Sequence, residues 1–379
     1  MVDVGSQVKI LYFSKGYTPH DHRFLSYLAE TDYAVYFMQL EKLLFTRENR
    51  PLPEGITTVT WGGGGKPLRL TNLFKFKRDL ERVLRDLRPD LVHAGPVQKG
   101  GFLTALTGFS PLITMSWGSD LLLDARMGLG RWIAKYTLGK TTVLLCDCDA
   151  VAEVAQELGM PRERIIQFPW GVDLDHFSPG SGKEIREALG WEDATILLST
   201  RNWEPVYGVN LVCQAFIKIA QNDEKTHLLL LGDGSLRDPI ERLLHRSGLE
   251  HRVHLAGFVS FDDLPKYYRA ANLYISASHV DGSSVSLLEA LACGIPALVS
   301  NIPGNREWVT PGVNGWWFQE GSAEALANVL LEAIQNIDQL RDYSEMSRQI
   351  AEERADWGKN SEGLHHAYKL ALAIEREQS

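Results

Sequence analysis

The chain has 379 residues, of which 44% are apolar and 23% charged, a composition typical of a globular protein with room for two domains. Its net charge of −9 is uneven: residues 1–180 hold 21 basic and 20 acidic residues, whereas residues 181–379 hold 18 and 28, which argues against nucleic-acid binding by the second half. No apolar run reaches the ~18 residues that span a bilayer, the N-terminus lacks a signal-peptide pattern, and four cysteines form no disulfide framework, so we expect a cytoplasmic protein.

The first elements predict an α/β domain. Residues 8–13 read as a buried strand, residues 23–30 as a helix and residues 34–38 as a second strand. The polar turn that contains Gly16 and Tyr17 then falls at the carboxyl edge of the sheet, where ligands of such domains bind. The alternative is that Gly16 only allows a tight turn.

An amphipathic helix is predicted over residues 73–87, because apolar residues recur there at helical spacing. Its other face is basic, with lysines and arginines distributed over residues 71–88. A basic face is usually solvated, but it also suits anionic lipid headgroups, which would place the protein peripherally on the inner face of a membrane.

Two further strand ends in the first half carry polar candidates. His93 lies in a strand predicted over residues 89–94, and Trp117 and Asp120 follow a strand that leads through residues 112–116. A histidine at a strand end is more often structural than catalytic, whereas Asp120 lies at the mouth of a βα loop and is favoured for function. The run of residues 146–149, Cys-Asp-Cys-Asp, has no partner ligands at metal-site spacing, so no metal is expected.

The second half repeats the α/β pattern after a Pro- and Gly-containing linker at residues 177–183. A strand over residues 194–200 ends at Arg201, whose planar, permanently charged fork suits phosphate oxygens. A strand over residues 228–231 ends at Gly232, and a strand and loop over residues 253–259 follow.

The most informative stretch runs from residue 276 to residue 303, where strand, small-residue loop, helix and strand follow one another. The loop at residues 282–284, Gly-Ser-Ser, opens the helix, and backbone N–H groups at a helix N-terminus bind anions. Glu289 lies about two turns into the helix and suits hydroxyl groups such as those of ribose, and Asp281 precedes the loop. Two carboxylates around an anion loop fit a nucleotide-sugar.

The pair Asp281 and Glu289, followed by the run Ala-Leu-Ala-Cys-Gly-Ile-Pro, resembles the nucleotide-sugar motif of the retaining GT-B glycosyltransferases of family GT4. The resemblance implies an α/β protein of GT-B type, in which two Rossmann-like doubly wound parallel-sheet domains face each other across a cleft. It implies an acceptor domain over residues 1–178, a nucleotide-sugar domain over residues 179–358, and a C-terminal helix over residues 359–379 that packs back on the first domain.

The resemblance also implies roles for individual residues. The catalytic set is Asp281, Arg201 and Asp120; the donor-binding set is Glu289, Gly282, Ser283, Ser284, Val285, Arg201, Tyr207, Gly232, Phe258 and Val259; the acceptor and phosphate loop set is Gly16, Tyr17, His93 and Trp117. The sequence departs from the family twice, because Asp281 replaces a glutamate and Tyr207 stands where a lysine is expected.

The implied activity is that of a hexosyltransferase, which moves a sugar with retention from a UDP-, GDP- or ADP-sugar to a glycan, lipid-linked glycan or lipid hydroxyl. The implied route is same-face displacement without a metal or other cofactor, in which the protein positions the substrates and stabilises charge. The two departures leave open a catalytically weak nucleotide-sugar-binding subunit, and the same fold leaves open a sugar-nucleotide epimerase.

Overall fold

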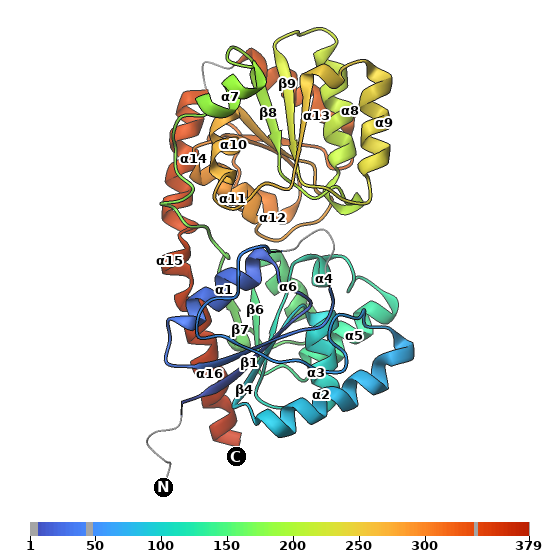
Figure 1. Ribbon diagram of the computed structural model, residues 1–379, viewed down its shortest axis with the longest axis vertical. Helices are drawn as coiled ribbons and strands as arrows, with labels where there is room; N and C mark the ends of the chain where they lie inside the picture. The colour runs from blue at the N-terminus through green and yellow to red at the C-terminus, as the bar shows by residue number, and fades with distance from the viewer. Residues whose placement is uncertain (1–6, 43–47, 337–339, 379) are drawn as a thin grey trace. The chain divides into compact units, whose positions relative to one another are not determined.

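The computed structural model describes residues 7–42, 48–336 and 340–378, and it divides the chain into two compact units. Unit 1 comprises residues 1–168 and 360–379, and unit 2 comprises residues 169–359 (Figure 1). The sequence placed the boundary at residue 178 instead. Val172 and Phe177 account for the difference, because both side chains are buried in a core cluster of unit 2.

Unit 1 is built on a seven-stranded sheet in the order β3-β2-β1-β4-β5-β6-β7, whose neighbouring strands are all parallel. The strands are β1 (Lys9–Ser14), β2 (Ala34–Gln39), β3 (Thr57–Thr58), β4 (Leu91–Ala94), β5 (Leu112–Met115), β6 (Val143–Cys146) and β7 (Ile165–Gln167). The helices are α1 (Pro19–Ala29), α2 (Leu73–Leu87), α3 (Phe102–Thr107), α4 (Ser119–Leu122), α5 (Gly128–Leu138), α6 (Asp149–Glu157) and α16 (Glu362–Gln378), with short turns η1 (Leu70–Asn72), η2 (Val97–Gly101) and η3 (Arg162–Arg164).

Helix α1 shows how local sequence sets an element of unit 1. Thr18 caps it by accepting a hydrogen bond from the backbone of Asp21, and the Asp21 carboxylate accepts one from the backbone N–H of Thr18. Pro19 at the first helical position fits the same start, because the missing N–H needs no partner there. The helix therefore begins earlier than residue 23, where the sequence analysis placed it.

Unit 2 is built on a six-stranded parallel sheet in the order β10-β9-β8-β11-β12-β13. The strands are β8 (Thr195–Ser199), β9 (Thr226–Leu231), β10 (Val253–Gly257), β11 (Leu273–Ser276), β12 (Ala297–Ser300) and β13 (Gly315–Phe318). The helices are α7 (Lys183–Leu189), α8 (Val209–Ala220), α9 (Arg237–Ser247), α10 (Leu264–Ala270), α11 (Val285–Ala292), α12 (Pro303–Arg306), α13 (Ala323–Gln335), α14 (Leu340–Arg354) and α15 (Trp357–Asn360), with η4 (Pro205–Tyr207) and η5 (Glu250–Arg252).

The sheet of unit 2 is covered on both faces. Along β8, Ile196 and Leu198 are buried in one core cluster and Leu197 in the other. Because successive side chains of a strand point to opposite faces, this alternation shows a doubly wound sheet with helices on both sides. Among the residues that the structure describes, no helix combines the length and apolar character needed to cross a bilayer.

Candidate functional site

The predicted anion loop of unit 2 is a rigid, buried turn between β11 and α11. Gly282, Ser283 and Ser284 are buried, and the indole N–H of Trp308 donates a hydrogen bond to the Ser283 hydroxyl over 3.0 Å. At the start of α12, Gly304 packs against the loop so closely that a Cβ there would lie 2.4 Å from the carbonyl oxygen of Gly282. Neighbouring backbone therefore holds the loop in place before any ligand binds.

Arg201 reaches this loop from the segment that follows the neighbouring strand β8. Its Nη1 donates to the hydroxyls of Ser284 over 2.6 Å and Ser286 over 3.0 Å, and its Nη2 lies 2.7 Å from Oδ2 of Asp281. The guanidinium carbon also lies 4.1 Å from the centre of the Tyr207 ring. The structure thus brings four predicted residues together with Ser286, to which the sequence analysis assigned no role.

The ion pair between Arg201 and Asp281 is largely withdrawn from water, since the two side chains are only 11% and 16% exposed. Burial lowers the pKa of Arg201, but the charge of Asp281 opposes this and leaves the pKa above its usual value. Burial raises the pKa of Asp281, and Arg201 opposes that shift. Arg201 therefore remains a cation, and Asp281 offsets its charge in the absence of ligand.

Glu289 lies on α11 behind the loop and is buried. The hydroxyl of Tyr268, on α10, lies 2.8 Å from Oε2 of Glu289 and 3.0 Å from the hydroxyl of Thr200. Burial raises the pKa of Tyr268 well above its usual value, so the phenol stays protonated. Its O–H group can therefore donate a hydrogen bond to Glu289. Sequence reasoning missed Tyr268 and Thr200, because they meet only where α10 packs against both α11 and β8.

The other predicted donor residues lie at neighbouring strand ends. Gly232 follows β9 with a φ of +88°, and a Cβ there would lie 3.0 Å from the carbonyl oxygen of Arg201. Its N–H donates to the carbonyl of Gly257 at the end of β10, directly before Phe258 and Val259. Phe258 is exposed, and Val285 is the first residue of α11. The predicted donor residues therefore lie in the segments that directly follow β8, β9, β10 and β11, with Val285 and Glu289 on α11.

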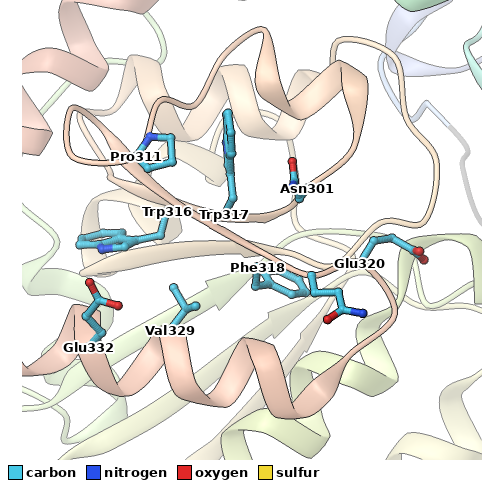
Figure 2. Close-up of a pocket in the computed structure, with 9 residues that line it drawn as sticks. Asn301, Pro311, Trp316, Trp317, Phe318, Glu320, Val329 and Glu332 are labelled. Carbon is cyan, nitrogen blue, oxygen red and sulfur yellow. The ribbon is translucent and has the colours of Figure 1, made fainter.

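An open pocket of about 700 Å³ lies elsewhere on unit 2, around the edge strand β13 (Figure 2). Trp316 and Trp317 project to opposite sides of this strand in Figure 2. The lining residues are Asn301, Pro311, Trp316, Trp317, Phe318, Gln319, Glu320, Val329 and Glu332. None of the predicted donor residues lines this pocket, so the pocket is separate from the loop at residues 282–284.

In unit 1, Asp120 organises the loop that follows β5. Its Oδ1 accepts hydrogen bonds from the Ser116 hydroxyl over 2.7 Å and the Trp117 N–H over 3.0 Å, and its Oδ2 accepts one from the Val97 N–H over 2.8 Å. Burial raises the pKa of Asp120 to about 6, although these hydrogen bonds act to lower it. Both carboxylate oxygens are thus engaged by the protein itself, and the Trp117 indole N–H is buried with no partner among the described residues.

This geometry predicts that Asp120 acts mainly through loop structure. Asp120→Asn would turn one acceptor oxygen into an NH₂ group that faces a donor, and an unsatisfied buried donor costs about 1–3 kcal/mol. We expect the free energy of unfolding, measured by urea denaturation, to fall by that amount. The exposed Asp124→Asn is the matched control, and an unchanged stability of Asp120→Asn would contradict this role.

His93 lies in the core of unit 1. Its Nδ1 is 2.8 Å from the hydroxyl of Tyr368 on α16, and its ring packs edge-on against Tyr12. Burial lowers its pKa to about 3, so the imidazole is neutral at pH 7. The sequence allowed a structural or a catalytic role for His93, and its buried packing fits the structural role.

The turn between β1 and α1 contains Gly16 and Tyr17 as predicted. Gly16 is buried, and the Tyr17 hydroxyl donates to the carbonyl of Pro51 over 3.0 Å. Asp21, which sequence reasoning did not select, is buried in α1 and accepts a hydrogen bond from the Tyr12 hydroxyl over 3.2 Å. Burial raises the pKa of Asp21 to about 6, against hydrogen bonds that lower it.

A metal site was not expected at the Cys-Asp-Cys-Asp run. Within residues 7–42, 48–336 and 340–378, no group of three or more His, Cys, Asp or Glu side chains is arranged to hold a metal ion. The four cysteines are all buried free thiols.

Comparison with known proteins matches both units to glycosyltransferase families. The family profile described as Glycosyl transferases group 1 matches residues 181–353, and the profile described as Glycosyl transferase 4-like matches residues 9–148. An uncharacterized glycosyltransferase of Methanocaldococcus jannaschii is 26% identical over 208 residues, which cover 54% of this chain and 53% of that protein. The match thus spans about half the length of this curated relative.

Solved structures share the architecture of nearly the whole chain. The sucrose-phosphate synthase of Thermosynechococcus elongatus gives a TM-score of 0.80 at 18% identity, covering 97% of this chain and 100% of that one. The Anabaena protein HepE in complex with UDP-glucose gives 0.78 at 17% identity, covering 96% and 100%. These likenesses confirm the predicted GT-B fold. With a parallel-sheet unit that matches the group 1 profile and another that matches the 4-like profile, this chain is a GT4-like glycosyltransferase.

Proposed function

We propose that this chain is a retaining hexosyltransferase that takes a sugar from a nucleotide-diphosphate sugar and transfers it to a hydroxyl acceptor. The observation that supports this most is Arg201, a buried cation held between the small-residue loop at residues 282–284 and Asp281. The N-terminus of α11 adds backbone N–H groups and partial positive charge on the same loop. Phosphate binds at this loop, and Glu289 accepts hydrogen bonds from ribose hydroxyls. The binding of UDP-glucose by the Anabaena protein of the same fold is consistent with a donor of this class.

In the proposed reaction the glycosidic oxygen of the diphosphate leaves as the acceptor hydroxyl attacks from the same face. Negative charge grows on the leaving phosphate, where Arg201 stabilises it, and the phosphate takes the acceptor proton. Asp281 is a poor nucleophile for a covalent intermediate, because Arg201 already engages its carboxylate at 2.7 Å. The proposal requires no divalent metal, since Arg201 and the helix terminus balance the diphosphate.

The decisive experiment incubates the purified chain with UDP-, GDP- and ADP-glucose and a panel of glycan and lipid acceptors, with and without excess EDTA. We expect an α-linked product, identified by its anomeric NMR coupling, and a rate that EDTA leaves unchanged. Nucleotide binding without turnover would instead support a partner subunit, and an altered sugar formed without acceptor would support an epimerase. A rate lost in EDTA and restored by Mg²⁺ or Mn²⁺ would contradict metal independence.

Glu289→Ala tests the ribose contact directly. A hydrogen bond to a charged group contributes about 1.5–3 kcal/mol, so we expect the Kd for the nucleotide, measured by calorimetry, to rise at least about tenfold. Tyr268→Phe removes only the hydroxyl that donates to Glu289 and should have a smaller effect. Glu332→Ala, an exposed glutamate on α13, is the matched control. An unchanged affinity of Glu289→Ala would rule out this contact.

A further inference from the structure

Large apolar side chains protrude from two segments of unit 1. Of the eight that are most exposed in the described chain, six lie at residues 70–74 and 123–132. Leu70 and Phe74 mark the start of α2, whereas Met127, Leu129 and Trp132 mark the start of α5, with exposures of 79%, 57% and 56% for these last three. Both α2 and α5 pack against α3, so the two segments belong to the same group of packed helices in unit 1 (Figure 1).

The Trp132 side chain is held outward by its neighbours. Its ring stacks on Tyr136 with centroids 5.6 Å apart and meets the buried Phe102 edge-on at 6.3 Å. Such packing limits the rotamers of Trp132, so the exposed indole face loses little entropy when it is covered. A fixed aromatic beside exposed Met127 and Leu129 is an apolar surface built into the fold.

Basic residues outnumber acidic ones around this surface, where the exposed Asp124 is the acidic residue of the segment 123–132. Residues 126–140 contain four basic and no acidic residues: Arg126, Arg131, Lys135 and Lys140. None of the four forms an ion pair with a carboxylate in the described part of the chain. On α2, the exposed basic residues Lys75 and Arg78 likewise lie close to an exposed apolar side chain, that of Phe74.

We propose that the start of α5, with Met127, Leu129 and Trp132, inserts into an anionic lipid bilayer while the basic residues of α5 and α2 contact the headgroups. Apolar side chains below a basic fringe match the layered polarity of a membrane interface, where tryptophan concentrates. A second copy of the chain fits poorly, because a twofold contact would set four uncompensated cations against four others. Together with the basic helix over residues 71–88, this surface positions the protein beside lipid-linked acceptors. This last step rests on the proposed function, which would then use acceptors of that class.

Vesicle co-sedimentation of the full chain tests the proposal, with phosphatidylglycerol–phosphatidylcholine vesicles compared with pure phosphatidylcholine. We expect binding only to the anionic vesicles and a decline with salt, because surface charges are screened within about 8–10 Å at physiological ionic strength. Met127→Ser combined with Leu129→Ser should weaken partitioning at least about tenfold. Arg131→Glu combined with Lys135→Glu should weaken it further, because each basic residue contributes about fivefold.

Matched controls come from unit 2. Leu331→Ser removes an exposed leucine from α13, and Arg242→Glu with Arg246→Glu reverses two exposed charges one helical turn apart on α9. Both should bind vesicles as the wild type does, and circular dichroism should show that all variants are folded. Nucleotide affinity, measured separately, should be unchanged in every variant, so a failed donor site and a failed lipid surface give different results.

Two outcomes would overturn the proposal. One is equal vesicle binding by the wild type and the Met127→Ser, Leu129→Ser variant at low salt, or no binding by either. The other is a light-scattering result in which the wild type is a dimer and this variant is a monomer. That result would assign the surface to contact with a second copy of the chain.

Discussion

Arg201→Ala should lower kcat by about 10²–10³, the loss found when one preorganised donor to a developing anion is removed. The guanidinium lies at the anion loop with two hydroxyl partners and Asp281 already in place, so little reorganisation is needed when the diphosphate arrives. Charge on the leaving oxygen grows as the sugar bond breaks, so the effect on kcat should exceed the effect on donor binding. Steady-state kinetics and calorimetry together separate the two.

Loss of the cation also leaves Asp281 buried without its partner, and an unpaired buried charge is strongly destabilising. Arg201→Lys keeps a charge but loses the fork that contacts Ser284, Ser286 and Asp281, so its kcat should fall between wild type and alanine. A Tm measured for each variant distinguishes lost folding from lost catalysis. If a folded Arg201→Ala enzyme kept nearly full kcat, the diphosphate would have to be stabilised by another group.

Local sequence was sufficient to predict the structure around the loop at residues 282–284. The strand, loop and helix around residues 273–293 follow from short-range signals: a buried apolar run, small residues, helical spacing and a Gly at the end. Arg201 could be placed beside the loop because β8 and β11 are parallel neighbours, so their carboxyl ends share one edge of the sheet.

Contacts between distant segments could not be predicted in this way. Tyr268 reaches Glu289 only through the packing of α10 on α11, and Tyr368 reaches His93 from 275 residues along the chain. The engagement of Oδ2 of Asp120 likewise depends on the N–H of Val97 in a preceding turn, whereas Oδ1 is bonded by Ser116 and Trp117 nearby in the sequence. Charged or polar residue types reveal a candidate site, but whether their atoms are already satisfied depends on tertiary structure.

The tyrosine that replaces the expected lysine illustrates this limit. From sequence, Tyr207 removes a positive charge from the phosphate site. In the structure its ring lies beneath the Arg201 guanidinium at 4.1 Å, and the next residue, Gly208, has a φ of +61° and would place a Cβ 2.2 Å from the carbonyl of Ala277. Close backbone packing thus fixes Tyr207 under Arg201. Burial raises the pKa of Tyr207 although Arg201 lowers it, so the phenol is neutral.

Tyr207→Phe keeps the ring and should change kcat by no more than about threefold. Tyr207→Ala removes a cation–π contact worth about 0.5–2 kcal/mol, so kcat should fall up to about thirtyfold. A larger loss in Tyr207→Phe than in Tyr207→Ala would show that the hydroxyl, not the ring, has the main role.

Tyr207→Lys provides the sharpest test, because it puts an ammonium group where the ring supports a guanidinium. Two like charges about 4 Å apart repel by up to about 4 kcal/mol near a protein surface, and Asp281 can offset only one of them. We therefore expect a Tm below that of the wild type without ligand, and a larger rise in Tm when a nucleoside diphosphate binds and supplies the missing negative charge. Differential scanning fluorimetry with and without UDP, GDP and ADP measures both shifts. A ligand-free Tm equal to that of the wild type would mean that the pocket accommodates a second cation, and that Tyr207 is not required to hold Arg201 in place.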